Sequence, residues 1–179
     1  MTHHAGDKDN TTSQILDVLL DCPLPKDSRL TIVLGSAAPH LASVQKAAMA
    51  MPVQTRVLYD VTDMAALMAC ADLSIGGGGS TAWERCCLGL PTLMLTIADN
   101  QLSIAKALDN AKAAVYVGDV RDDGWKPLLV DKMKLAADEN WRKDISATAA
   151  AICDGNGAAR TADAINKLLA EQALYQASK

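Results

Sequence analysis

A chain of 179 residues with a net charge of −4 has the size of one domain, and a chain of this size can bury about 70% of its unfolded surface. The acidic balance and the absence of phenylalanine exclude a basic nucleic-acid surface with aromatic stacking platforms. Five cysteines without regular spacing argue against a disulfide framework. We expect a cytoplasmic protein, because the start is polar and no apolar run is long enough to span a membrane.

Strands and helices are predicted to alternate along the chain. A helix is expected first, at 14–20. Strands are then expected at 30–35, 55–61, 73–76, 91–97 and 113–119. Helices are expected between them at 43–51, 64–71, 81–89 and 101–111, and in the tail around 126–151 and 158–175. Short apolar strands separated by helices predict a doubly wound α/β domain, with a parallel sheet covered on both faces.

The first predicted helix, QILDVLL at 14–20, has no strand before it. A doubly wound domain normally opens with a strand. We therefore expect that the chain starts just inside a larger protein.

A glycine-rich turn is the most informative motif. The segment ADLSIGGGGSTAWERCCLGLP at 71–91 runs a short strand into four glycines and then a helix. Glycines have no side chain and so permit a ligand to approach the backbone closely. A helix start offers free N–H groups and a positive dipole end, so a phosphate is the expected ligand. Two alternatives remain open on the motif alone. Asp99 follows Gly79 by 20 residues, a spacing typical of an NAD site, and the glycines could simply close strand onto helix.

Two acidic residues near this turn allow structural and functional interpretations. Thr81-x-x-Glu84 has the spacing of a capping box, in which the carboxylate accepts from the first backbone N–H of the helix. Alternatively, Glu84 accepts hydrogen bonds from the two hydroxyls of a ribose. Asp99 follows a buried strand, where it could cap the next helix or face a ligand at the carboxyl end of the sheet.

Cysteine and histidine give no sign of a metal or cofactor. Cys86 and Cys87 lie on a predicted helix, where small core residues are expected. No histidine or cysteine lies nearby at the spacing of metal ligands, so we expect no metal and no cofactor. The three histidines stand apart from any nucleophile or carboxylate and are expected at the solvated surface: His3, His4 and His40.

The stretch DMAALMACADLSIGGGGSTAWERCCLGLPTLMLTIADNQ at 63–101 resembles a known family. It is similar to the C-terminal half of the UDP-2,4-diacetamido-2,4,6-trideoxy-β-L-altropyranose hydrolases of pseudaminic acid biosynthesis. A more distant similarity is to the lipid II-forming N-acetylglucosaminyltransferase, and both proteins have the two-domain GT-B fold. The resemblance is dense over 58–118 and looser over 6–16 and 154–160. Its most specific part is the combination WERCCLGLP and ADNQ.

The resemblance implies a UDP-sugar site on a Rossmann-like domain, the C-terminal domain of a GT-B fold. The diphosphate would be held by backbone N–H and hydroxyl groups of Gly77, Gly78, Gly79, Ser80 and Thr81. Glu84 would accept the ribose hydroxyls, while Asn100 and Gln101 would face the sugar. The uracil pocket would comprise Tyr59, Asp60, Val61 and Met64. Asp99 then belongs, with Asn100 and Gln101, to the segment that faces the sugar, which disfavours the NAD interpretation.

The implied function is UDP-sugar binding within a hydrolase that cleaves the anomeric C–O bond and releases UDP. In that family a histidine of the N-terminal half works with the attacking water, and no histidine of this chain lies in a matching motif. No catalytic residue is therefore assigned here. The implied partners are UDP or a UDP-sugar, and the missing N-terminal domain in cis or on a second chain. The alternatives are a glycosyltransferase nucleotide-binding domain and a stand-alone, non-catalytic UDP-sugar-binding domain.

Overall fold

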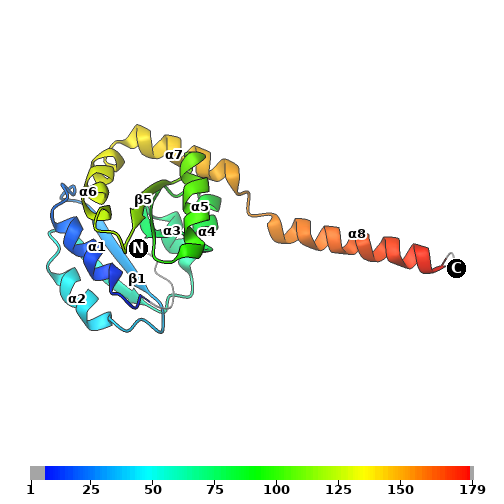
Figure 1. The fold of residues 1–179 in the computed structure, drawn as a ribbon, viewed down its shortest axis with the longest axis horizontal. Coiled ribbons are helices and arrows are strands. Elements are labelled where there is room, and N and C mark those ends of the chain that lie inside the picture. Colours follow the sequence, from blue (N-terminus) through cyan, green and yellow to red (C-terminus); the bar gives the residue numbers. More distant parts are fainter. Residues whose placement is uncertain (1–6, 178–179) are drawn as a thin grey trace.

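The computed structural model describes residues 7–177 and has the predicted alternation of strands and helices (Figure 1). The strands are β1 (Arg29–Leu34), β2 (Gln54–Tyr59), β3 (Ser74–Gly77), β4 (Thr92–Thr96) and β5 (Val115–Asp119). The first five helices are α1 (Thr11–Leu20), α2 (Leu41–Met49), α3 (Met64–Ala69), α4 (Thr81–Cys87) and α5 (Asp99–Asn110). Three more follow β5: α6 (Trp125–Ala136), α7 (Glu139–Ile152) and α8 (Gly157–Ala177).

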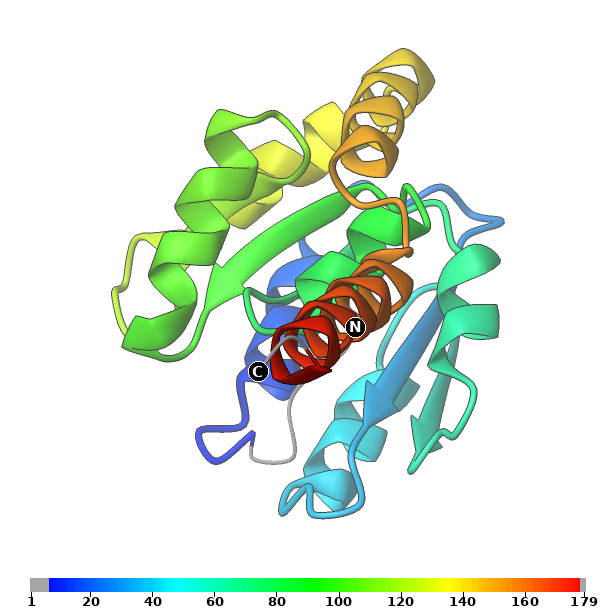
Figure 2. The same cartoon turned by 90° about the vertical axis from the view of Figure 1, so that its right-hand side faces the viewer.

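The strands form two parallel ladders. β1 pairs with β2 from Arg29 opposite Gln54 onward, and β4 lies between β3 and β5. Within the described residues no ladder joins β1 to β3, and the two groups meet through side chains of one shared core. β3 is short and ends in glycines, which form strands poorly. The arrowheads of both ladders point toward the same end of the domain (Figure 2).

Helices cover both faces of the strands, as a doubly wound domain requires. Successive residues of a strand point to opposite faces, and β4 is buried throughout. Leu93 and Leu95 pack into a core formed with α1, α2 and α6. Met94 packs into a second core formed with α4, α5 and α7. This arrangement confirms the α/β, Rossmann-like class that the sequence predicts.

The tail differs in detail from the sequence prediction. The helical region expected around 126–151 consists of α6 and α7, which are separated at Asp138. The Asp138 carboxylate accepts a hydrogen bond from Asn140 N at 2.8 Å and so starts a new helix. α8 projects away from the rest of the molecule (Figure 1), and Ile165, Leu168 and Leu169 are exposed on it. Across residues 7–177, no helix combines the length and the apolar character needed to cross a membrane.

The chain before α1 carries a capping residue that the sequence analysis did not identify. Asp7 is buried, and its carboxylate accepts hydrogen bonds from Thr11 N at 2.6 Å and Thr12 N at 3.0 Å. These two bonds satisfy free N–H groups of the first helical turn, so the helix begins at Thr11 rather than at residue 14.

Candidate functional site

The glycine-rich turn leads from the carboxyl end of β3 into the start of α4. Gly78 N donates to Leu95 O at 3.1 Å, which anchors the turn to β4. The first turn of α4 is closed by bonds from Ala82 N to Gly79 O and from Trp83 N to Ser80 O, both at 3.0 Å. The turn therefore lies at the carboxyl edge of the strands, where ligands of open α/β sheets bind.

Gly78 has a packing reason to lack a side chain. A Cβ at this position would lie 3.1 Å from Gln101 O and 3.2 Å from Met94 Sδ. At Gly77 the nearest group to such a Cβ would be Gln101 Oε1, at 3.5 Å. The turn thus approaches the start of α5 closely on its inner side. The glycines do close strand onto helix here, and the phosphate role of the outer side stays a prediction.

The start of α4 leaves polar side chains without partners. Ser80 lies at the N-cap position and makes no side-chain cap bond. The capping box is not formed, because Thr81 is already the first helical residue and Glu84 lies one position too deep. Glu84 is exposed, and its carboxylate makes no hydrogen bond to the part of the chain that the structure describes. Both side chains are therefore open to a ligand.

Arg85 is an unexpected component of this site. Its side chain is only 1% exposed, and its Nε donates to Thr81 O at 3.2 Å while Nη2 donates to Gly77 O. Nη1 has no hydrogen-bond partner. Burial lowers the pKa of Arg85 to about 10, so the guanidinium is still charged at neutral pH. The sequence offered one signal, an arginine inside the helical run WERCCLG.

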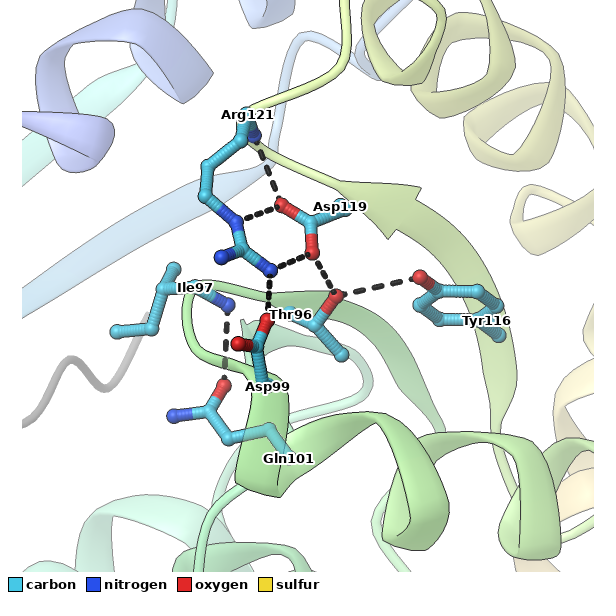
Figure 3. Close-up of polar contacts among 7 residues, drawn as sticks. All are labelled: Thr96, Ile97, Asp99, Gln101, Tyr116, Asp119 and Arg121. Carbon is cyan, nitrogen blue, oxygen red and sulfur yellow. Dashed lines mark hydrogen bonds and ion pairs between the residues drawn. The ribbon is translucent and has the colours of Figure 1, made fainter.

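A polar network lies beside the turn, at the ends of β4 and β5 (Figure 3). Arg121 Nη2 pairs with Asp99 Oδ1 at 2.6 Å and with Asp119 Oδ2 at 2.7 Å. The buried Thr96 hydroxyl donates to Asp119 Oδ2 at 3.2 Å, so the Tyr116 hydroxyl, 3.2 Å away, donates to Thr96 Oγ1. Asp99 is the first residue of α5 rather than its N-cap, which is Ala98. Its carboxylate binds Arg121 instead.

The two residues expected to face the sugar are placed differently. Asn100 is exposed, in the first turn of α5. Gln101 is buried, and its Oε1 accepts a hydrogen bond from Ile97 N at 3.1 Å (Figure 3). Its Oε1 lies 3.5 Å from the position that a Cβ at Gly77 would take, and its backbone O lies 3.1 Å from the corresponding position at Gly78. Gln101 therefore ties the turn to α5, and Asn100 is the more accessible of the pair.

The residues expected around uracil cluster at the carboxyl end of β2. Tyr59 is 46% exposed, and its hydroxyl donates to Ser36 O. Asp60 has a positive φ of 52°, and its N–H donates to Leu34 O at 3.0 Å. Val61 is half-buried, and Met64 opens α3. The Asp60 N–H is therefore already used within the fold, and the uracil role of these four residues stays a prediction.

Histidine and cysteine show no arrangement of catalytic type. His40 is half-buried, and its Nε2 donates to Lys8 O at 2.8 Å; His3 and His4 lie outside the described residues. Cys86 is buried as expected, and burial raises the pKa of its thiol. Cys87 is instead exposed, with its Sγ 2.9 Å from Cys153 Sγ. Residues 7–177 contain no cluster of three or more His, Cys, Asp or Glu side chains suited to a metal ion.

Replacing Arg121 by methionine is expected to lower the melting temperature at pH 6 by about 2–4 °C. The hydrogen bond from Arg121 lowers the pKa of Asp119 to about 2, below the value of about 3.9 for an unfolded aspartate. The stabilisation is therefore complete above pH 4 and is lost as the pH falls toward 2. Thermal melts of wild type and variant should converge near pH 2.

The matched control is Lys134→Met, which removes an exposed pair with Asp131 on α6. Exposed pairs of this kind contribute little to stability, so its melting temperature should stay within about 1 °C of wild type. A constant difference between wild type and Arg121→Met from pH 6 to pH 2 would contradict the assigned role of Asp119.

Comparison with known proteins gives two informative similarities. No protein-family model matches the chain. Over 93 residues it is 36% identical to the spore coat polysaccharide biosynthesis protein SpsG of Bacillus subtilis (strain 168), covering 52% of this chain and 27% of that protein. Over 115 residues it is 35% identical to the UDP-N-acetylglucosamine--N-acetylmuramyl-(pentapeptide) pyrophosphoryl-undecaprenol N-acetylglucosamine transferase of Sorangium cellulosum (strain So ce56), covering 61% of this chain and 28% of that protein.

The aligned part thus spans about a quarter of the length of these relatives. The similarities support the glycosyltransferase-like, GT-B-type relation that the sequence predicts. They do not confirm the hydrolase family, and they favour the transferase alternative over it.

Proposed function

We propose that this chain is the nucleotide-sugar-binding domain of a glycosyltransferase-like protein of GT-B type, and that it binds UDP at the carboxyl edge of its strands. The observation that carries the proposal is the start of α4. A glycine-rich turn there leads into a helix whose exposed Ser80 and Glu84 side chains have no partner in the described fold. One relative takes a UDP-sugar as substrate according to its name.

Each part of the nucleotide has a matching group. The outer side of the turn from Gly77 to Thr81 would hold the diphosphate through backbone N–H groups, hydroxyls and the positive end of the helix dipole. Glu84, one helical turn further, would accept both ribose hydroxyls. Uracil would lie near Asp60, and Asn100 would face the sugar. Neutralising the diphosphate makes UDP a better leaving group, which is the chemical contribution of this domain.

The rest of the reaction is assigned to another domain, in cis or on a partner chain. A hollow of about 370 Å³ lies between α1 and α6, lined by Gln14, Asp17, Val18, Asp21, Lys126, Pro127 and Val130. That hollow lies away from the glycine turn. Ser80 is the exposed residue of the turn, and the opposite wall of the nucleotide cleft would belong to the other domain.

Hydrolysis of the UDP-sugar is a second candidate, favoured by the resemblance of WERCCLGLP and ADNQ to the hydrolases. The two reactions share this binding site and differ in whether water or a hydroxyl of another molecule attacks the anomeric carbon. Fold alone cannot separate them. Product analysis of the complete protein does: free sugar with UDP indicates hydrolysis, and a new glycoside with UDP indicates transfer.

UDP is expected to stabilise the domain thermally. Binding to the native state alone adds RT ln(1 + [L]/Kd) to the free energy of unfolding, about 1.4 kcal/mol at ten times Kd. NAD at equal concentration should have little effect, because its ribose would have to compete with Arg121 for the exposed Asp99 carboxylate. Differential scanning fluorimetry with UDP, NAD and no ligand measures both. A shift with NAD and none with UDP would overturn the site assignment.

A further inference from the structure

Arg85 is a buried cation without an ionic partner. Its side chain is among the largest fully buried ones, and no carboxylate within residues 7–177 forms an ion pair with it. Neighbouring Glu84 is exposed and forms no ion pair with Arg85, although its charge favours the guanidinium at longer range. Burying an unpaired charge is costly, and buried arginines are normally paired. The position of this charge therefore calls for a functional explanation.

The guanidinium lies on the inner side of the glycine-rich turn and contacts both of its ends. Nη2 donates to Gly77 O, where β3 ends, and Nε donates to Thr81 O, where α4 begins. Nη1 is buried and unpaired. These contacts place a full positive charge directly behind the backbone whose outer side is the candidate diphosphate site. Two carbonyl oxygens satisfy part of its hydrogen bonding but supply no compensating charge.

We propose that Arg85 is the buried counter-charge of the bound diphosphate and acts on it through the turn without touching it. The inference rests on the proposed UDP site and adds the group that makes this site selective for the charged part of the nucleotide. A diphosphate on the outer side would compensate the buried cation across one layer of backbone. In a poorly solvated setting this attraction changes affinity by about 10- to 50-fold.

Replacing Arg85 should weaken UDP binding while changing the stability of the domain little. Replacing a buried charge by an apolar side chain of similar length is often neutral or stabilising. The melting temperature of Arg85→Met should therefore lie at most a few degrees below that of wild type. Its affinity for UDP should be about 10- to 50-fold weaker. Arg85→Gln retains a donor for one carbonyl but loses the charge, and should show a comparable loss of UDP affinity.

The experiment compares uridine, UMP and UDP by NMR titration and calorimetry on wild type, Arg85→Met and Arg85→Gln. We expect uridine affinity to change less than about twofold, and the loss to grow from uridine to UMP to UDP. Lys106→Met removes an exposed charge from α5 and should leave all three affinities within about twofold. Equal losses for uridine and UDP would overturn the proposal, because they would show a purely structural role.

A second measurement uses wild type alone and so does not depend on whether the Arg85 variants fold. The Arg85 Nε–H donates to Thr81 O, so its NMR resonance in wild type reports on the turn directly. UDP should shift it and uridine should not; the absence of any shift at saturating UDP would contradict the inference. A wild-type domain that binds no UDP would instead refute the proposed function itself, so the two failures are distinguishable.

Discussion

The 179-residue chain alone is expected to release UDP from UDP-N-acetylglucosamine no faster than buffer does. Uniform binding of substrate and transition state does not accelerate a chemical step. Positioning of the attacking group and general acid–base catalysis, worth several orders of magnitude together, are assigned to the other domain. His40 is the one histidine of residues 7–177, and its Nε2 already donates to Lys8 O. The measurement is UDP release followed by ³¹P NMR.

Supplying the proposed N-terminal GT-B domain, in cis or as a second chain, should create activity with UDP as a product. The same complex carrying Gly78→Val is the matched negative control. Its added side chain would press on Gln101 O and Met94 Sδ and displace the turn. Turnover by the chain alone, at an enzymatic rate, would show that the catalytic group lies within these residues and that the proposed division of labour is wrong.

Glu84→Gln is expected to weaken UDP binding by about 1.5–3 kcal/mol, because the amide accepts from the ribose hydroxyls far less strongly than the carboxylate. The melting temperature without ligand should stay close to that of wild type, since the Glu84 carboxylate makes no hydrogen bond within the described fold. Calorimetry with UDP and with 2′-deoxy-UDP separates the roles. Wild type should bind 2′-deoxy-UDP more weakly than UDP, whereas the variant should bind the two ligands almost equally.

The control for this substitution is Glu171→Gln on the exposed α8, which should change neither binding nor stability. A Glu84→Gln variant that binds UDP normally but melts early would contradict the ribose role. It would show instead that the carboxylate stabilises the start of α4 in solution.

Local sequence patterns were sufficient to predict the elements and the α/β class. The apolar run at 92–96 indicates the buried strand β4. The glycines at the end of β3 indicate where that strand ends and α4 begins. The capping box failed by one position, because Ser80 rather than Thr81 precedes the helix. Such a shift depends on how the turn is held against β4 and α5, which a linear motif does not contain.

The inner side of the site could not be predicted, because it depends on contacts between distant residues. The burial of Arg85 is set by how α4 packs against the strands and α7. The engagement of Asp99 depends on Arg121, which is 22 positions away in the chain. Gln101 was expected to face a ligand, and it is instead buried against Gly77 and Gly78. Polar residues near a turn can face either way, and tertiary packing decides which.

The most direct test of the UDP site is an NMR titration of the uniformly ¹⁵N-labelled domain with UDP. We expect the largest amide shifts at the turn from Gly77 to Thr81, smaller ones at Glu84 and Asp60, and saturation with a single Kd. Amides lining the hollow between α1 and α6, such as those of Val18 and Val130, should not move. Shifts confined to that hollow, or none at the glycine-rich turn at saturating UDP, would show that UDP does not bind at the turn.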